Sequence, residues 1–181
     1  MSVSGYSEPH SEDRLLLLED WMEQFGSDVL NVAYGYVKNY HVAEDITQDV
    51  FLRAYTKMDS FRGQSSVRTW LLSITANRCK DYLRSWAVRH EVHSELGLER
   101  EPGGTQTEQD VVARMERDAL WNLVHRLPLK YREVLLLFYQ RELSTAEVAQ
   151  TLGITEATAR TRLHRGRTLL RQWMEAGEVE P

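Results

Sequence analysis

The chain has 181 residues, of which 42% are hydrophobic and 27% are charged, and its formal net charge at pH 7 is −5. This length allows one medium domain or two small ones. No apolar run approaches the roughly 20 residues that cross a bilayer, and residues 15–18 lack the flanks of a signal peptide. We therefore expect a cytoplasmic protein without membrane insertion. Cys79 is the one cysteine, so an internal disulfide is excluded and a buried thiol is expected.

The charges are distributed unevenly along the chain. Residues 1–60 have a net charge of −7 and residues 91–118 a net charge of −5, whereas residues 61–90 carry +5 and residues 144–173 carry +3. Chance clustering on solvated faces is one explanation. Each basic segment, however, coincides with a motif described below.

The spacing of apolar residues is helical throughout, and no segment alternates as a β-strand does. One stripe covers residues 14–38, with Gly26 as a candidate break, and a second covers residues 42–57. Residues 61–66 interrupt the pattern and predict a loop that ends in a serine N-cap. A third helix is predicted from Val67 onward.

The periodicity fades between Val88 and Asp110, in an acidic segment that contains Pro102-Gly103-Gly104. Such a segment is typical of a linker. Helical spacing resumes near Leu120, and Pro128 ends one helix and opens the next. The sequence therefore predicts an all-α fold of two small helical domains, residues 1–90 and 113–181, joined by an acidic linker over residues 91–112.

Residues 144–173 have the pattern of a helix-turn-helix that docks on double-stranded DNA. Ser144 and Glu147 form a capping box, Gly153 ends the first helix, and Thr155 is placed to cap the second. The second helix has an apolar face and, opposite it, polar side chains: Arg160, Thr161, His164 and Arg165. A helix fits the major groove, where arginine pairs with guanine edges, and other arginines suit phosphates. An ordinary helical hairpin with a solvated arginine-rich face is the alternative.

The N-terminal block carries two further patterns. Three polar residues lie largely on the helix face opposite Ile46 and Val50: Asp45, Gln48 and Asp49. Aromatic residues also interleave with basic ones over residues 61–90: Phe61, Trp70, Tyr82 and Trp86. That mixture suits exposed bases, which stack on rings while basic groups hold the backbone. Trp70 lies on the apolar stripe, so we expect it in the core.

In this order and spacing, the motifs resemble the extracytoplasmic-function (ECF) sigma factors, the compact two-domain group of the sigma-70 family. The resemblance rests on residues 43–51, 61–63, 69–71, 127–128 and 131–134, on Ile74 and Asn77, and on the helix-turn-helix. Four positions depart from the residues frequent in the family: Val67, Thr155, Ala157 and Ala159. The departures in the helix-turn-helix bear on which −35 sequence is preferred.

The resemblance implies a subunit that binds the β′ and β subunits of core RNA polymerase, recognises promoter DNA, aids melting of the −10 element and is held by an anti-sigma factor. The implied contacts with core polymerase are Asp45, Gln48 and Asp49. The implied −10 site, with a loop for a flipped base, is Phe61, Arg62, Gly63, Gln64, Ser65, Asn77, Arg78, Lys80 and Arg84. The implied −35 site is Arg160, Thr161, Arg162, His164, Arg165 and Arg167.

Two other classes of function compete with this one. A self-contained helix-turn-helix regulator would use the N-terminal block as a sensor or dimerisation module. An enzyme would need catalytic residues, and the sequence shows no phosphate-binding glycine loop or nucleophile elbow. His90 and His93 are too few for a zinc site, so we expect neither a metal nor a cofactor.

Overall fold

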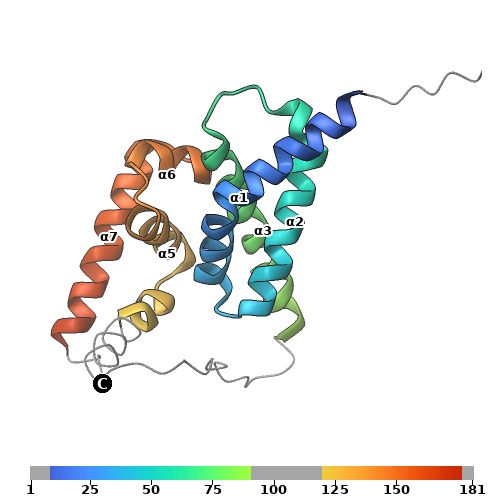
Figure 1. Ribbon diagram of the computed structural model, residues 1–181. Helices are drawn as coiled ribbons and strands as arrows, with labels where there is room; N and C mark the ends of the chain where they lie inside the picture. Colours follow the sequence, from blue (N-terminus) through green and yellow to red (C-terminus); the bar gives the residue numbers. More distant parts are fainter. Residues whose placement is uncertain (1–8, 91–119, 177–181) are drawn as a thin grey trace, which may run out of the picture. The chain divides into compact units, whose positions relative to one another are not determined.

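The computed structural model describes residues 9–90 and 120–176, and within them every regular element is helical (Figure 1). The linker expected at residues 91–112 therefore lies outside the described residues. The chain divides between Ser94 and Glu95 into two compact units, which we call the N-terminal and C-terminal units. The prediction of an all-α fold with two helical parts is confirmed. Within the described ranges, no helix has the length and apolar character needed to cross a bilayer.

Over residues 9–90, the N-terminal unit has three long helices and a short 3-10 turn. These are α1 (Pro9–Val37), α2 (Tyr40–Lys57), η1 (Met58–Ser60) and α3 (Val67–His90). Each of the three long helices packs against the other two. The candidate break at Gly26 was wrong, because α1 continues through it. A helical glycine costs only about 1 kcal/mol, and the buried Trp21 and Val29 anchor the helix on either side.

A tight turn joins α1 to α2. Lys38 adopts the left-handed conformation with φ of 56°, and its amide donates to the Tyr34 carbonyl at 2.9 Å. The Asn39 side chain then accepts a hydrogen bond from the Val42 amide at 3.0 Å and caps α2. These contacts reverse the chain, so α2 lies along α1.

The core of the N-terminal unit is apolar, and ion pairs join its helical elements around that core. Its fully buried side chains include Val29, Val32, Tyr36, Val50, Leu71 and Leu72. Arg14 contacts Asp59 at 2.8 Å, and Arg68 contacts Asp28 at 2.6 Å. Cys79 is completely buried, as expected, and burial raises the pKa of its thiol to about 12. At neutral pH Cys79 is therefore a protonated core residue rather than a nucleophile.

The C-terminal unit begins, in the described part, with a helix over residues 120–126. It continues with α5 (Leu129–Leu135), the π-helical turn η2 (Leu136–Gln140), α6 (Thr145–Leu152) and α7 (Glu156–Glu175). Pro128 is the N-cap of α5, so the predicted break is confirmed. The long helix α7 packs against both α5 and α6. Its position is therefore fixed by two neighbours.

The close approach of α7 to α5 depends on Gly166. A Cβ atom at this buried position would lie 3.1 Å from Leu135 Cδ1 and 3.4 Å from Tyr131 Cβ. We expect Gly166→Val to lower the free energy of unfolding by about 1.5 kcal/mol through overpacking. Gly166→Ala should be nearly neutral, because better helix propensity, about 1 kcal/mol, offsets a small shift of Leu135. Urea denaturation followed by circular dichroism tests this, and equal stability of the two variants would contradict the tight crossing.

Candidate nucleic-acid interface

The helix-turn-helix has the local geometry that the sequence predicted. Ser144 Oγ accepts from the Glu147 amide at 3.3 Å, and Glu147 Oε2 accepts from the Ser144 amide at 2.9 Å. Gly153 adopts φ of 65° and ψ of 37° at the end of α6. Thr155 then caps α7 by accepting from the Thr158 amide at 3.2 Å. These local bonds fix where α6 ends and where α7 begins.

The outward face of α7 carries four exposed polar side chains: Arg160, Thr161, His164 and Arg165. Glu156 organises the start of this face. Its Oε1 accepts from the Thr145 hydroxyl at 2.7 Å and from Arg160 Nη2 at 2.6 Å. These bonds lower the pKa of Glu156, the Thr145 bond most. The carboxylate therefore links the first turns of α6 and α7 and orients Arg160.

The other two arginines of the implied −35 site make contacts within the protein. Arg162 Nη1 lies 3.1 Å from Glu133 Oε1, and their side chains are 26% and 5% exposed. The Arg167 guanidinium lies 5.5 Å from the centre of the Phe138 ring and 5.4 Å from that of Tyr139. Sequence spacing did not reveal these partners, since they lie on α5 and η2.

The contact with Glu133 gives Arg162 a structural role that can be measured. We expect Arg162→Ala to lower the free energy of unfolding by about 1.5 kcal/mol, because a charged hydrogen bond to a buried carboxylate is lost. The double variant Arg162→Ala with Glu133→Gln should recover part of that loss, since the buried charge is removed as well. Thermal denaturation of the four proteins measures the coupling. Additive losses would show that the two residues do not interact.

A basic pocket of about 350 Å³ lies between the start of α5 and the first half of α7. Its polar lining residues are Lys130, Tyr131, Thr158, Thr161, Arg162 and Arg165. Hydrogen bonding from Arg165 is the largest cause of a lowered pKa at the Tyr131 hydroxyl, and the charge of Lys130 adds to it. Sequence reasoning missed Lys130 and Tyr131 because only the fold brings them beside α7.

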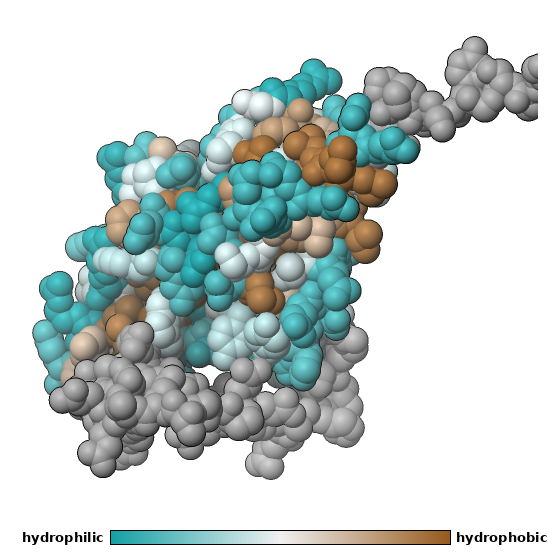
Figure 2. Space-filling model, in the orientation of Figure 1, coloured by the Kyte–Doolittle hydropathy of each residue, from teal (hydrophilic) through white to brown (hydrophobic). Residues whose placement is uncertain are grey.

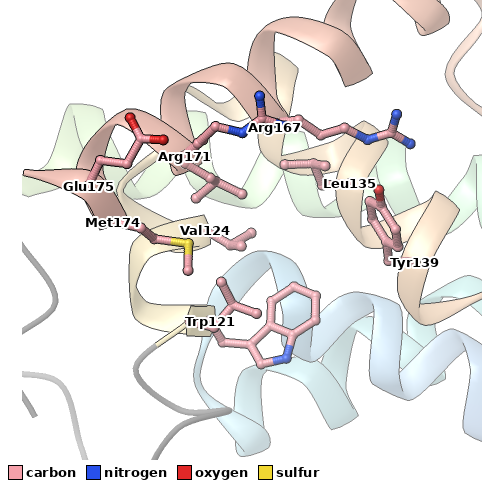
Figure 3. Close-up of a pocket in the computed structure, with 10 residues that line it drawn as sticks. Trp121, Val124, Leu135, Tyr139, Arg167, Arg171, Met174 and Glu175 are labelled. Atoms are coloured by element: carbon pink, nitrogen blue, oxygen red, sulfur yellow. The ribbon is translucent and has the colours of Figure 1, made fainter.

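A second, apolar groove of about 630 Å³ lies elsewhere on the C-terminal unit. Figure 3 shows side chains from four elements around it: Trp121 and Val124 from the helix over 120–126, Leu135 from α5, Tyr139 from η2, and Arg167, Arg171, Met174 and Glu175 from α7. Tyr139 and Met174 are each 53% exposed. An open apolar groove of this size with charged side chains from α7 suits a protein partner.

The acidic face of α2 is present in the N-terminal unit. Asp45 and Gln48 are exposed, whereas Asp49 is half-buried and accepts hydrogen bonds from Arg53, at 2.9 Å, and from Arg78. Partial burial of Asp49 opposes ionisation, but the two arginines outweigh it and hold the pKa of Asp49 below its usual value. This face also lines a pocket of about 400 Å³ between α2 and α3.

Leu52 continues the acidic face by one more turn of α2. It lies seven residues after Asp45, and therefore on the same side of the helix, and it is 66% exposed. An exposed leucine beside two carboxylates adds apolar area to a polar docking surface. The sequence analysis did not single out this residue.

The loop before α3 is organised by aromatic packing and one glycine. Phe61 lies 4.8 Å from Trp70 and 6.3 Å from Trp21, measured between ring centres. Trp70 is thus part of an aromatic cluster but only half-buried, less than expected. Gly63 has φ of 67°, which favours glycine, and Arg62, Gly63 and Gln64 are exposed. The predicted cap is confirmed, because Ser66 Oγ accepts from the Thr69 amide at 3.1 Å.

The implied −10 residues of α3 do not all lie on one side of the helix. Asn77, Lys80 and Arg84 are spaced three and four residues apart and share one face. Arg78 instead reaches α2, where it contacts Asp49, and it also lies 3.7 Å from Asp81. The structure thus places Arg78 beside the acidic face of α2. Arg84 also contacts Asp81, at 3.2 Å, so the two arginines share this carboxylate.

The N-terminal part of α1 has an apolar surface. Leu15, Leu16, Leu17 and Met22 are between 41% and 63% exposed. Figure 2 shows apolar side chains gathered over this part of the N-terminal unit. Solvent-exposed leucines in succession on a helix are typical of a surface that contacts another protein.

Each of the two units matches a known protein family. The model of sigma-70 region 2 matches residues 21–88, and the model of sigma-70 region 4 matches residues 117–170. The chain is 34% identical over 161 residues to the ECF RNA polymerase sigma factor SigW of Bacillus subtilis, covering 84% of this chain and 86% of SigW. It is 30% identical over 168 residues to the RNA polymerase sigma factor YlaC of the same organism, covering 90% and 95%.

A solved structure shows the same fold. The sigma factor RpoE of Bartonella quintana, crystallised with the anti-sigma factor NepR, aligns with a TM-score of 0.61 at 20% identity, covering 92% of this chain and 96% of that one. The two region matches together span more than half of the chain, and SigW matches over most of its own length. The chain belongs to the ECF group of RNA polymerase sigma factors, within the sigma-70 family.

Proposed function

We propose that this chain directs core RNA polymerase to specific promoters and aids melting of the −10 element. The observation that carries the proposal is the presence, on one chain of this family, of two polar surfaces suited to DNA. One is the exposed face of α7 around Arg160 and Arg165, and the other is the loop at Gly63 with the α3 face around Asn77. In this proposal the region 2 domain covers residues 1–90, the linker covers residues 91–112, and the region 4 domain covers residues 113–181.

The acidic face of α2 is the proposed contact with the polymerase β′ subunit. Asp45 and Gln48 are exposed, and Asp49 is ionised and held by Arg53 and Arg78. A carboxylate that is already held in place, as that of Asp49 is, attracts a basic partner without a further loss of side-chain entropy. In this proposal Arg78 shapes the acidic face, and Leu52 adds apolar contact.

The loop over residues 61–65 is the proposed site for a base flipped out of the −10 element. Extruding a base costs a few kcal/mol of stacking, so it needs a preformed receptor. Packing of Phe61 on Trp21 and Trp70 anchors one end of the loop, and the Ser66 cap fixes the other. Asn77, Lys80 and Arg84 then offer an amide for a base edge and cations for phosphates.

The outward face of α7 is the proposed reader of the −35 element. Arg160, Thr161, His164 and Arg165 project from a helix that is fixed at its start by the Thr155 cap and by Glu156. Arg162 and Arg167 support this helix through Glu133 and the aromatic pair on η2. They would therefore contribute to the −35 site mainly by positioning.

We further propose that an anti-sigma factor controls this protein, which acts in the cytoplasm as a specificity subunit rather than an enzyme. The similarity to an RpoE crystallised with the anti-sigma factor NepR supports such control. The exposed leucines of α1 and the apolar groove of the C-terminal unit are surfaces on which polymerase or an anti-sigma factor can dock.

Transcription by reconstituted holoenzyme tests the proposal. Purified chain and core polymerase are incubated with genomic DNA from the source organism, and the 5′ ends of the transcripts are sequenced. The proposal predicts start sites that require the chain and share two upstream elements at constant spacing. Binding of the chain alone to a duplex site, with no dependence on core polymerase, would instead indicate a self-contained regulator.

A further inference from the structure

The residues that line the basic pocket between α5 and α7 suit the binding of one anionic group. Lys130, Arg162 and Arg165 supply positive charge around a space of about 350 Å³, and none of the described residues that line the pocket carries a carboxylate. Glu133 contacts Arg162 but is itself only 5% exposed and is absent from the lining. The accessible surface of the pocket is therefore positive.

Tyr131 lies among the cations of this pocket. The ammonium of Lys130 lies 5.1 Å from the centre of the Tyr131 ring, and Arg165 lines the same pocket from α7 and lowers the pKa of the Tyr131 hydroxyl. Arg165 is exposed at the end of the polar face that includes Thr161. A group bound in the pocket is therefore next to any duplex that lies on the outward face of α7.

We propose that this pocket binds one phosphate of the promoter DNA backbone, contacted by Lys130 and Arg165, with Tyr131 as a positioning residue for Arg165. The inference rests on the proposed function, because α7 must lie on the −35 duplex for the phosphate to reach the pocket. A phosphate contact carries no sequence information, but it fixes the register and orientation of a recognition helix on the duplex. The pocket would thus set how α7 enters the groove.

The test replaces single phosphates by neutral methylphosphonates. Holoenzyme made with the full chain is bound to a promoter fragment obtained from the transcript map, with one modified phosphate at a time around the −35 element. At one position around the −35 element, the methylphosphonate should weaken DNA binding by the wild-type holoenzyme. The same methylphosphonate should have no effect on holoenzyme made with Lys130→Gln. Lys130→Gln should also reduce the slope of log K against log salt by about 0.9, since one fewer counterion is released.

Two further variants separate positioning from bulk charge. Tyr131→Phe keeps the ring and removes the hydroxyl, so it should weaken the response to the same methylphosphonate without a change in melting temperature. Arg126→Gln removes one charge from the same unit outside the pocket, where Arg126 stacks on Trp173 at 5.2 Å, and it should keep the wild-type response.

Failure of the phosphate site and failure of the proposed function give different results. If Lys130→Gln shows the wild-type response at every phosphate, the pocket does not bind the backbone, while the proposed function stands. If Arg126→Gln loses the same response as Lys130→Gln, the effect is general electrostatics and the inference fails. If no promoter-specific complex forms with the wild type, the proposed function itself fails.

Discussion

Asp45→Arg is expected to weaken binding to core RNA polymerase by about a hundredfold, because placing like charges together at an interface costs several kcal/mol. Asp45 is exposed on the acidic face of α2 and makes no ion pair that the structure shows among the described residues, so its reversal should leave the fold intact. Fluorescence anisotropy of the labelled chain, titrated with core polymerase, measures the loss. Promoter-specific transcription at limiting polymerase should fall in parallel.

A matched variant separates this effect from net charge. Glu142→Arg makes the same charge change at an exposed position between η2 and α6, outside every proposed docking surface, so it should bind core polymerase within about threefold of the wild type if only long-range charge is altered. Asp49 is a poorer choice, because its contacts with Arg53 and Arg78 make any substitution a structural change as well. Equal losses in Asp45→Arg and Glu142→Arg would contradict a specific contact at α2.

The second large effect concerns the two promoter elements. We expect Asn77→Ala and Arg165→Ala each to reduce promoter-specific transcription about thirtyfold, equivalent to about 2 kcal/mol, because the first removes a proposed contact with a base and the second a proposed contact with the −35 duplex. The two losses have different origins. Asn77 lies on α3 beside the loop that would hold a flipped base, whereas Arg165 lies on the outward face of α7.

A template melted in advance around the −10 element distinguishes the two. If Asn77 acts in opening, the Asn77→Ala defect should largely disappear on that template, and permanganate reactivity on duplex DNA should show reduced melting. The Arg165→Ala defect should persist on both templates. Asn31→Ala, at an exposed position on α1, is the control and should be active throughout. Equal rescue of Asn77→Ala and Arg165→Ala would show that the proposed division of roles is wrong.

Features fixed by neighbouring residues could be predicted from the sequence. The capping box at Ser144, the left-handed Gly153 and the cap at Ser66 each depend on bonds that span a few residues, and all three are present. Pro128 likewise marks a helix start by its own chemistry. These signals, with the helical spacing of apolar residues, were enough to predict the two helical units. The family was inferred from the resemblance of the motifs at residues 43–51, 61–63, 69–71, 127–128 and 131–134, together with the helix-turn-helix.

Features that depend on packing between helices could not be predicted in the same way. Arg162 and Arg78 were assigned to DNA because of their charge, yet each contacts a carboxylate 29 residues away. Lys38 and Glu142 adopt positive φ in turns where their residue type gives no signal. The basic pocket is likewise invisible along the chain, since Tyr131 and Arg165 meet only when α7 crosses α5 at Gly166.

The central claim is that the chain confers promoter specificity on core polymerase. Run-off transcription from one promoter found in the transcript map tests it most directly, with the chain alone, core polymerase alone and the two together. We predict a transcript of defined length only when both are present, and its loss when either the −10 or the −35 element is scrambled. A transcript of the same yield without the chain, or one insensitive to both elements, would contradict the claim.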